Sequence, residues 1–356
     1  MRFNSRNSHL RSLCALAFLC ACAIVLLTSS AFAAFSKVGT TGAAFLKISV
    51  GRPTGMGDAF CAVADDPSAT WYNPAGIAHL GRREIMLNHI QWIAGMNHEH
   101  LAGILPISGI GTVGLSVTAL GTGDIAITTI DNPSTRARED TFTGVSYSGN
   151  DFAVTATYAR LITDKLAFGL SAKGVTEQIY NSSASGVGLD IGLLYNTGFN
   201  NLRIGAAVMN FGSDLSFSGL NLDFIDSTRN TRPPASYKTT PAPLPIIFRF
   251  GLAYDVLNAG NNKLVADVDL VHPSDINETV NFGLEYGYAS RFFVRAGYIL
   301  NTDFDYIADV GWTQGLSAGA GVSFTPVRGL DMKLDYGYRH QGFLGGTHRL
   351  TLGFSF

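Results

Sequence analysis

Three groups of residues could do chemistry, but each lacks part of the arrangement that its chemistry needs. Residues 315–319 fit the G-x-S-x-G pattern of a serine hydrolase, which needs a strand, a sharp turn and then a helix; here a strand-like segment follows instead. His98 and His100 would share one face of a strand and could suit a metal ion, although such a pair beside a loop is more often solvated. Cys61 has no nearby histidine to activate it. We therefore expect no enzyme, no metal site and no cofactor.

The N-terminus and the cysteines predict an exported protein. An apolar run of 15 residues, 13–27, follows a basic leader, and a small-x-small pattern ends at Ala33, which predicts a signal peptide over residues 1–33 with cleavage near Ala33. Cys22 lies in a lipoprotein-like box and is the alternative cleavage site, but the apolar run continues beyond it. Cys61 is the one cysteine that follows the signal peptide, so no intramolecular disulfide is expected.

The composition excludes several classes of protein. Charged residues make up 15% of the chain, against about 25% in an average soluble protein. The 25 Lys and Arg residues do not outnumber the 27 Asp and Glu residues, so the chain has no excess of positive charge with which to bind nucleic acid. Aromatic residues make up 11% of the chain, which argues against disorder. No helix-like apolar run of about 18 residues follows the signal peptide, which argues against a helical membrane protein.

The rest of the chain consists largely of segments of about ten residues that alternate with period two. In residues 291–300, Phe292 and Val294 fall on one face, whereas Arg291 and Arg295 fall on the other. The same alternation recurs in three further segments: 263–271, 281–288 and 331–339. A soluble β-sandwich would also alternate, with its apolar face inside. The export signal and the scarcity of charge favour a transmembrane β-barrel whose apolar face points outward to lipid.

Counting these segments predicts 14 strands, an even number as in bacterial single-chain barrels. The predicted strands are 85–93, 97–107, 111–120, 151–162, 165–180, 186–197, 202–211, 245–257, 262–272, 279–289, 291–300, 315–325, 330–341 and 347–356. Connections after even-numbered strands are short, whereas those after odd-numbered strands include three long ones, 121–150, 212–244 and 301–314. Short periplasmic turns and long outer loops produce this asymmetry, whereas a sandwich does not. We expect an all-β, 14-stranded antiparallel barrel over residues 84–356.

Several charged side chains fall on the inward face of the predicted strands. They are Asp267, Asp269, Glu285, Arg295, Lys333 and Asp335. Charges that line the inside of a barrel are normally structural or tune selectivity. We expect these six side chains to face the lumen and not to catalyse a reaction.

The last predicted strand ends on an aromatic residue. Phe354 and Phe356 share the apolar face of this strand, and Phe356 is the final residue of the sequence. An alternating final strand with a terminal aromatic looks like the signal that barrel-assembly machinery recognises. The pair is therefore our candidate assembly signal.

Residues 34–83 differ from the predicted barrel, because they are too rich in glycine for a lipid-facing strand. We expect this segment to be a hatch that folds inside the lumen. Gly55 and Gly57 would permit close approach of the backbone or positive φ. Asp65 or Asp66 could cap buried N–H groups, and Pro74 fixes a turn after an asparagine.

The hatch carries a resemblance to a known family. Residues 49–66 read SVGRPTGMGDAFCAVADD, and residues 69–78 read ATWYNPAGIA. This pattern resembles the N-terminal signature of the PorV/PorQ family and, more loosely, that of the FadL long-chain fatty-acid transporters. The resemblance implies a 14-stranded outer-membrane barrel with an N-terminal hatch, in agreement with the strand count. The positions that match it are Gly55, Gly57, Asp65, Asp66, Asn73, Pro74, Ala75 and Gly76.

The members of these families differ in function, so the resemblance leaves two roles open. FadL-like members admit hydrophobic molecules, and we expect first that this chain passes small hydrophobic solutes across the bacterial outer membrane. PorV-like members take part in protein secretion and surface attachment, which is the alternative. The expected partners are outer-membrane lipid, the barrel-assembly machinery and either hydrophobic small molecules or secreted proteins. Arg52 and Pro53 stand where the family has a small residue, so the start of the hatch is expected to differ.

Overall fold

The structure is a computed structural model that describes residues 41–130, 140–199, 201–225, 234–303 and 311–356. The predicted signal peptide and the first part of the predicted hatch, residues 34–40, lie outside the described residues. Within the described ranges, no helix has both the length and the apolar character needed to cross a membrane.

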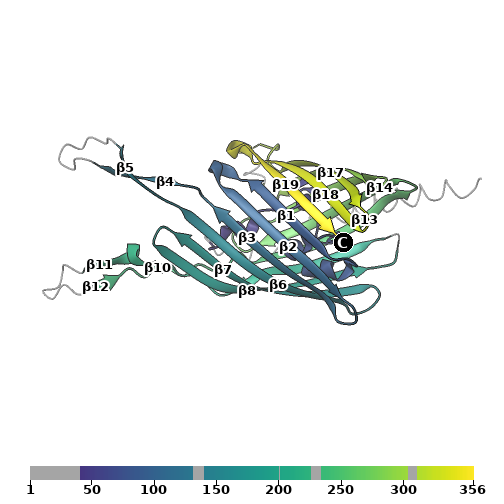
Figure 1. The fold of residues 1–356 in the computed structure, drawn as a ribbon, viewed down its shortest axis with the longest axis horizontal. Helices are drawn as coiled ribbons and strands as arrows, with labels where there is room; N and C mark the ends of the chain where they lie inside the picture. The colour runs from purple at the N-terminus through teal and green to yellow at the C-terminus, as the bar shows by residue number, and fades with distance from the viewer. Residues whose placement is uncertain (1–40, 131–139, 200, 226–233, 304–310) are drawn as a thin grey trace, which may run out of the picture. The chain divides into compact units, whose positions relative to one another are not determined.

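Fourteen antiparallel strands form one closed sheet in the described part of the chain (Figure 1). Each strand pairs with the next barrel strand along the chain, and the first strand pairs with the last, so the fold prediction is confirmed. The strands are β1 (Glu84–Gln91), β2 (Asn97–Ile107), β3 (Gly111–Gly121), β6 (Gly149–Leu161), β7 (Leu166–Ile179), β8 (Ser182–Asn196), β9 (Arg203–Gly212), β13 (Ile247–Ala259), β14 (Asn262–Pro273), β15 (Thr279–Tyr288), β16 (Phe292–Asn301), β17 (Leu316–Val327), β18 (Leu330–His340) and β19 (Gly346–Ser355).

Two of the three predicted long loops contain short strands, so they are not entirely irregular as the sequence predicts. The first holds the hairpin of β4 (Ile125–Ile130) and β5 (Asp140–Tyr147). The second holds these short elements: β10 (Ser218–Gly219), η5 (Leu220–Leu222), β11 (Asp223–Ile225) and β12 (Pro234–Ser236). The β-branched residues that make up most of β4 explain why it is extended rather than irregular. Part of the third loop, 304–310, lies outside the described residues.

The two ends of the barrel differ in their connections. One end carries only short turns: 108–110, 162–165, 197–202, 260–261, 289–291 and 328–329. We call it the short-turn end. It also holds the end of the chain, where Arg83 and Phe356 exchange backbone hydrogen bonds. The opposite end, which we call the long-loop end, carries both extra hairpins (Figure 1).

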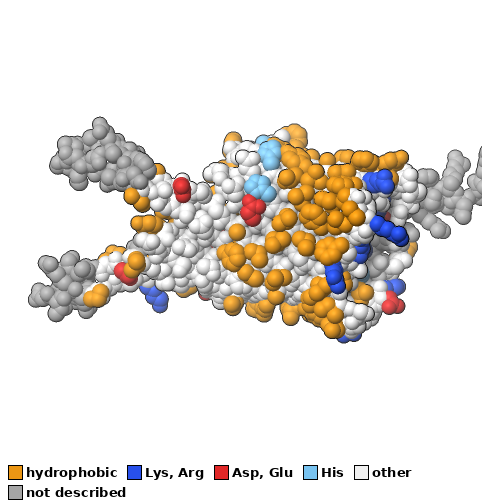
Figure 2. Space-filling view, in the orientation of Figure 1, with side chains coloured by type: hydrophobic (Ala, Val, Ile, Leu, Met, Phe, Trp, Pro, Cys, Tyr) orange, Lys and Arg blue, Asp and Glu red, His pale blue; other side chains and the backbone are white. Residues whose placement is uncertain are grey.

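The outer wall is apolar and the inner wall is polar, as the alternation predicts. On β15 and β16, Leu284 and Val294 are 49% and 62% exposed, whereas Arg295 is 4% exposed. Hydrophobic side chains gather in a broad band across the barrel wall on the face drawn in Figure 2, and we call it the apolar band. The inward residue Gly283 instead lies against Met56 of the N-terminal segment.

Residues 41–83, which we call the N-terminal segment, pack against opposite parts of the inner wall. The segment contains η1 (Ala44–Lys47), η2 (Arg52–Met56), α2 (Ala69–Tyr72) and η3 (Pro74–His79). Helix η2 contacts β15 to β18, and η3 contacts β3 and β6 to β8. The remaining helices, η4 (Ile93–Gly95) and η6 (Gly342–Leu344), lie in connections of the long-loop end. The segment therefore reaches from one side of the barrel interior to the other.

Candidate functional site

Glycines bring the N-terminal segment directly onto the barrel wall. Gly57 has a φ of +64°, and a Cβ atom there would lie 2.8 Å from the backbone nitrogen of Tyr298. A Cβ atom at Gly55 would lie 2.9 Å from Cα of Gly319, a glycine of the wall. On the wall itself, a Cβ atom at Gly297 would lie 2.0 Å from the nitrogen of Gly57. Both surfaces must lack side chains at these points for the backbones to touch.

Asn73 fixes the second half of the segment to the first half and to the wall. Its fully buried side chain donates from Nδ2 to the carbonyl oxygens of Cys61, at 2.8 Å, and Leu193, at 2.9 Å. Its Oδ1 accepts a hydrogen bond from the backbone N–H of Ala75 and thereby caps η3, which begins at Pro74. A Cβ atom at Gly76 would lie 2.2 Å from the carbonyl oxygen of Ala64. The Asn-Pro-Ala-Gly sequence thus holds a tight structural turn.

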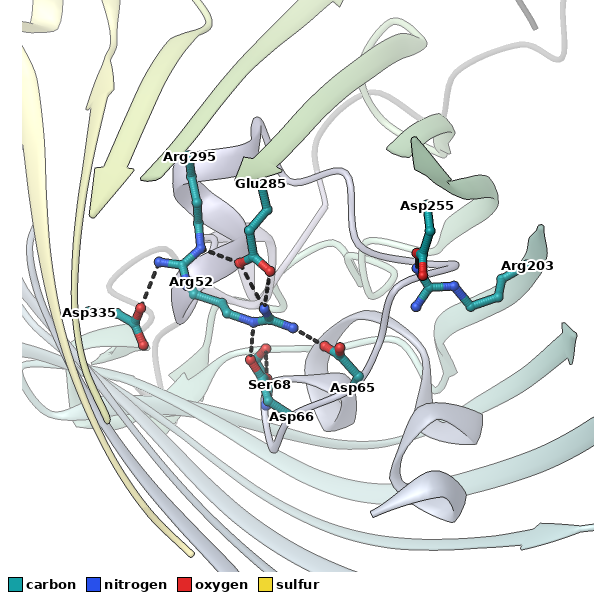
Figure 3. A network of polar contacts seen from close by, with 9 residues as sticks. All are labelled: Arg52, Asp65, Asp66, Ser68, Arg203, Asp255, Glu285, Arg295 and Asp335. Carbon is teal, nitrogen blue, oxygen red and sulfur yellow. Dashed lines mark hydrogen bonds and ion pairs between the residues drawn. The ribbon is translucent and has the colours of Figure 1, made fainter. Parts of the chain in front are cut away.

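A network of charged side chains joins the segment to three strands (Figure 3). Arg52, at the start of η2, donates from Nη1 to both carboxylate oxygens of Glu285 on β15 and from Nε to Asp66 at 2.5 Å. Its Nη2 also pairs with Asp65, which is partly exposed to solvent. Arg295 on β16 extends the network by donating to Glu285 at 2.5 Å and to Asp335 on β18 at 2.6 Å. Three of the six predicted inward charges, Glu285, Arg295 and Asp335, therefore form one ion-pair network with Arg52.

Asp66 is ionised within this network. Burial opposes its ionisation, but Arg52 and the hydrogen bonds from the Ser68 hydroxyl and backbone N–H outweigh burial, so the pKa of Asp66 is lowered from its ordinary value. Lys333, which is half-buried on β18, adds a further positive charge to the surroundings of Asp66. The carboxylate therefore keeps its bond to Arg52 at neutral pH.

Asp267 and Asp269 lie on another part of the inner wall and do not join the Arg52 network. Both are fully buried on β14. Asp269 accepts hydrogen bonds from the backbone N–H groups of Phe60 and Cys61, each at 2.9 Å, so it holds the middle of the segment. Burial raises the pKa of the Cys61 thiol, which is consistent with a small packed side chain rather than a reactive one.

A second charged contact was not recognised in the sequence. Arg339 on β18 donates to Asp58 of the segment at 2.7 Å, and the Tyr72 hydroxyl donates to the same carboxylate at 3.2 Å. Burial, followed by the Asp58 carboxylate, raises the pKa of the Tyr72 phenol. The alternation did place Arg339 on the inward face, but nothing in the sequence indicates which residue of the segment it contacts.

The histidine pair is buried, so the expectation that it is solvated was wrong. His98 and His100 point inward from β2, and the ring of Trp71 meets both of them edge-on at 6.0 and 5.3 Å. In the described ranges, no group of three or more His, Cys, Asp or Glu side chains is arranged to hold a metal ion. The G-x-S-x-G serine, Ser317, lies within β17 rather than at a turn before a helix. Neither feature forms a catalytic arrangement.

The two aromatic residues of the candidate assembly signal lie at the short-turn end. Phe354 is half-buried on β19, and Phe356 follows the strand with its side chain 47% exposed. Both residues thus lie where the last strand of the barrel ends. Their recognition by assembly machinery stays a prediction.

An apolar pocket lies at the long-loop end. Its volume is about 540 Å³, and no charged side chain lines it. Tyr147 and Tyr180 meet edge-to-face there, with ring centroids 5.8 Å apart. The lining residues are Ile127, Tyr147, Ile179, Tyr180, Ser182, Phe217, Leu222 and Thr239. The pocket joins the β4–β5 hairpin, the β7–β8 turn and the loop before β11, so it suits an uncharged hydrophobic molecule.

Comparison with known proteins finds similarity of structure but not of sequence. No family model and no curated protein sequence matches the chain. The toluene transporter TbuX of Ralstonia pickettii aligns at a TM-score of 0.52 and 15% identity, over 85% of this chain and 96% of that one. The toluene transporter TodX of Pseudomonas putida aligns at a TM-score of 0.54 and 13% identity, over the same shares of the two chains. The chain therefore shares the fold of these two transporters.

Proposed function

We propose that this protein lies in the bacterial outer membrane and passes small, uncharged hydrophobic molecules across it. The observation that carries the proposal is the uncharged apolar pocket at the long-loop end, above an interior that the N-terminal segment occupies. The apolar outer wall and the predicted signal peptide support the location. TbuX and TodX share the fold and transport toluene, which supports a hydrophobic molecule as the solute.

The proposed route begins at the apolar pocket and continues past the N-terminal segment. Because the segment contacts both sides of the interior, a solute must move it or pass beside it. The Arg52 contact with Glu285 holds the segment to the wall, so it is the contact that we expect to change when the segment moves. Asn73 and Asp269 hold the rest of the segment and would keep it folded during this change.

A second candidate function is a PorV-like role as a non-enzymatic partner in protein secretion or surface anchoring. One observation favours it: Phe224 and Tyr237 stack on the β11–β12 hairpin at the long-loop end, with ring centroids 4.5 Å apart and both side chains exposed. Exposed aromatic pairs of this kind are common in protein-binding surfaces. The two functions differ in their ligand, so one experiment can separate them.

The experiment measures uptake of a radiolabelled monoaromatic hydrocarbon by cells whose own hydrophobic-compound transporters have been deleted. Expression of this protein should raise the uptake rate. Ile179→Asp, which places a hydrated carboxylate in the wall of the apolar pocket, should lower that rate by about tenfold, since an apolar solute would have to displace the water bound to that charge. Leu220→Asp is the matched control, because Leu220 is 73% exposed in the neighbouring η5 and does not line the pocket. Unchanged uptake on expression, with the barrel shown to be inserted, would leave the secretion role as the better proposal.

A further inference from the structure

Charge is distributed unequally between the two ends of the barrel. Over the full sequence, the connections of the long-loop end contain five basic residues against twelve acidic ones. The short-turn end has the opposite composition. Its connections and the residues before β1 contain five basic residues, Arg82, Arg83, Lys165, Arg291 and Arg328, against one acidic residue, Asp164. Figure 2 shows Lys and Arg side chains gathered where the apolar band ends.

Four exposed arginines at this end directly adjoin the apolar band, and we call them the arginine collar. They are Arg83, Arg160, Arg291 and Arg328. Arg160 lies two residues beyond the outward Tyr158 on β6, and Arg291 and Arg328 each neighbour a strongly exposed apolar residue in sequence. An arginine in such a position can lay its aliphatic stem along apolar surface while its guanidinium reaches the polar layer next to it.

The arginine collar extends over more than half of the barrel circumference. In the closed sheet, β6 is followed by β3, β2, β1, β19, β18, β17, β16 and β15, and the four arginines lie at β6, before β1, and in the β17–β18 and β15–β16 turns. Across the described residues, none of the four side chains forms an ion pair with a carboxylate, whereas the neighbouring Arg82 pairs with Asp331. Their charges are therefore available to an outside partner.

We infer that the arginine collar binds the phosphate groups of anionic phospholipids in the leaflet that surrounds the short-turn end. The inference rests on the proposed membrane location. Lipid headgroups are the one anionic partner that meets a barrel all around its rim at the edge of the apolar band, whereas an acidic protein would contact one side. Each basic residue close to an anionic lipid surface favours binding by about fivefold.

The test reconstitutes the purified barrel in vesicles of equal parts phosphatidylcholine and phosphatidylglycerol and counts the lipids retained after extraction by native mass spectrometry. We expect phosphatidylglycerol to be enriched about fivefold or more, and the enrichment to fall as salt is raised. The variant with Gln at all four positions (R83Q, R160Q, R291Q, R328Q) should retain both lipids equally. The matched control with Lys at the same positions should keep the enrichment, because the charge remains.

Several outcomes would overturn the inference. Equal retention of both lipids by the native barrel would do so and would leave an acidic protein as the better partner for the collar. Enrichment that survives in the Gln variant would show that other residues select the lipid. The double variant R160Q/R291Q, which keeps the other two charges, should show an intermediate enrichment if the fourfold variant does not insert. The experiment measures retained lipid, so loss of lipid selectivity can be told apart from loss of solute uptake. A barrel that does not enter vesicles would contradict the proposed membrane location.

Discussion

Arg52 and Glu285 are joined by two hydrogen bonds, in which Nη1 of Arg52 donates to Oε1 at 2.9 Å and to Oε2 at 2.8 Å. The two residues are far apart in the sequence, and their contact is the point at which the N-terminal segment meets β15. Arg295, on the barrel strand β16, donates a hydrogen bond to the same carboxylate. Glu285 therefore lies between two arginines, one that belongs to the segment and one that belongs to the barrel.

Replacing Glu285 should loosen the segment without opening the barrel. Glu285→Gln removes the carboxylate that Arg52 shares with the buried Arg295, and breaking a buried ion pair costs about 3–5 kcal/mol. Cys61 is the one cysteine that follows residue 33, and it is fully buried between the N-terminal segment and the barrel wall. We expect maleimide to label it faster in the variant, because a loosened segment exposes its thiol. Vesicles carrying the variant should also leak a small dye.

The control for this variant is Asp65→Asn, which removes a carboxylate that is 44% exposed and should cost less than about 1 kcal/mol. Equal labelling of Cys61 in the native protein and in Glu285→Gln would show that the Arg52 contact does not hold the segment.

The outward face should tolerate charge poorly, and in a depth-dependent way. Leu284→Arg or Val294→Arg should lower the free energy of unfolding by about 2–4 kcal/mol if these positions lie near the bilayer midplane. Val327→Arg should cost about 0–1 kcal/mol, because Val327 is the last residue of β17 at the short-turn end. Urea titration of the barrels in vesicles would measure all three values. Similar costs at Val327 and Leu284 would contradict the assigned membrane band.

Gly283, the inward neighbour of Leu284, is unsuitable as a control for those variants. A Cβ atom there would lie 2.7 Å from the carbonyl oxygen of Met56, so any side chain would displace the N-terminal segment. Asn281 is also fully enclosed and accepts a hydrogen bond from Thr279.

Acid should release the segment through Asp66. Since the pKa of Asp66 is lowered in the folded protein, its carboxylate contributes stability at pH values above the ordinary pKa of 3.8, and this contribution is lost as the pH falls through the lower, folded pKa. Labelling of Cys61 after brief exposure to pH between 5 and 2 should therefore rise below about pH 3.8. In Asp66→Asn the rise should already be present at pH 5 and should change less with acid. A pH profile identical in both proteins would exclude Asp66 as the titrating group.

The tight turn at Gly76 should not accept a methyl group. Gly76→Ala would place a Cβ atom 2.2 Å from the carbonyl oxygen of Ala64, and such overpacking costs about 1–3 kcal/mol. Asn73→Ala should cost about as much, because the buried carbonyl group of Cys61 and the partly buried one of Leu193 lose their donor. Both variants should reduce hydrocarbon uptake while the barrel still migrates as a heat-modifiable band on a gel. Gly103→Ala is the control, since no atom lies within 4 Å of a Cβ atom there, and a Gly76→Ala barrel with native uptake would contradict the structural role of the turn.

The barrel could be predicted from the sequence because its signal is local. Exposed and buried side chains alternate along most of residues 97–107. The strand predicted there has the same bounds as β2. The largest error was at β8, which begins at Ser182 rather than at residue 186, where serine and alanine give little contrast between the faces. The hairpin strands β4 and β5 are not evident from the sequence, because they lie in a long connection between two predicted barrel strands.

The contacts within the interior could not be predicted, since they depend on which turn of the segment meets which strand. Arg52 departs from the family pattern, which marks it in the sequence, but its partner Glu285 lies 233 residues away. The sequence alone favours solvated side chains at His98 and His100, because it does not show that Trp71 covers them. An inward position can be derived from alternation alone, whereas a pairing requires the packed structure.

The pairing of β1 with β19 has a consequence for the order of events during assembly. These two strands are the first and last of the barrel, so the cylinder cannot close before the whole chain has been delivered. The N-terminal segment directly precedes β1 and is therefore available from the beginning, while the sheet is still open. The remaining strands then curl around a part that is already present, and no later threading through a finished wall is needed.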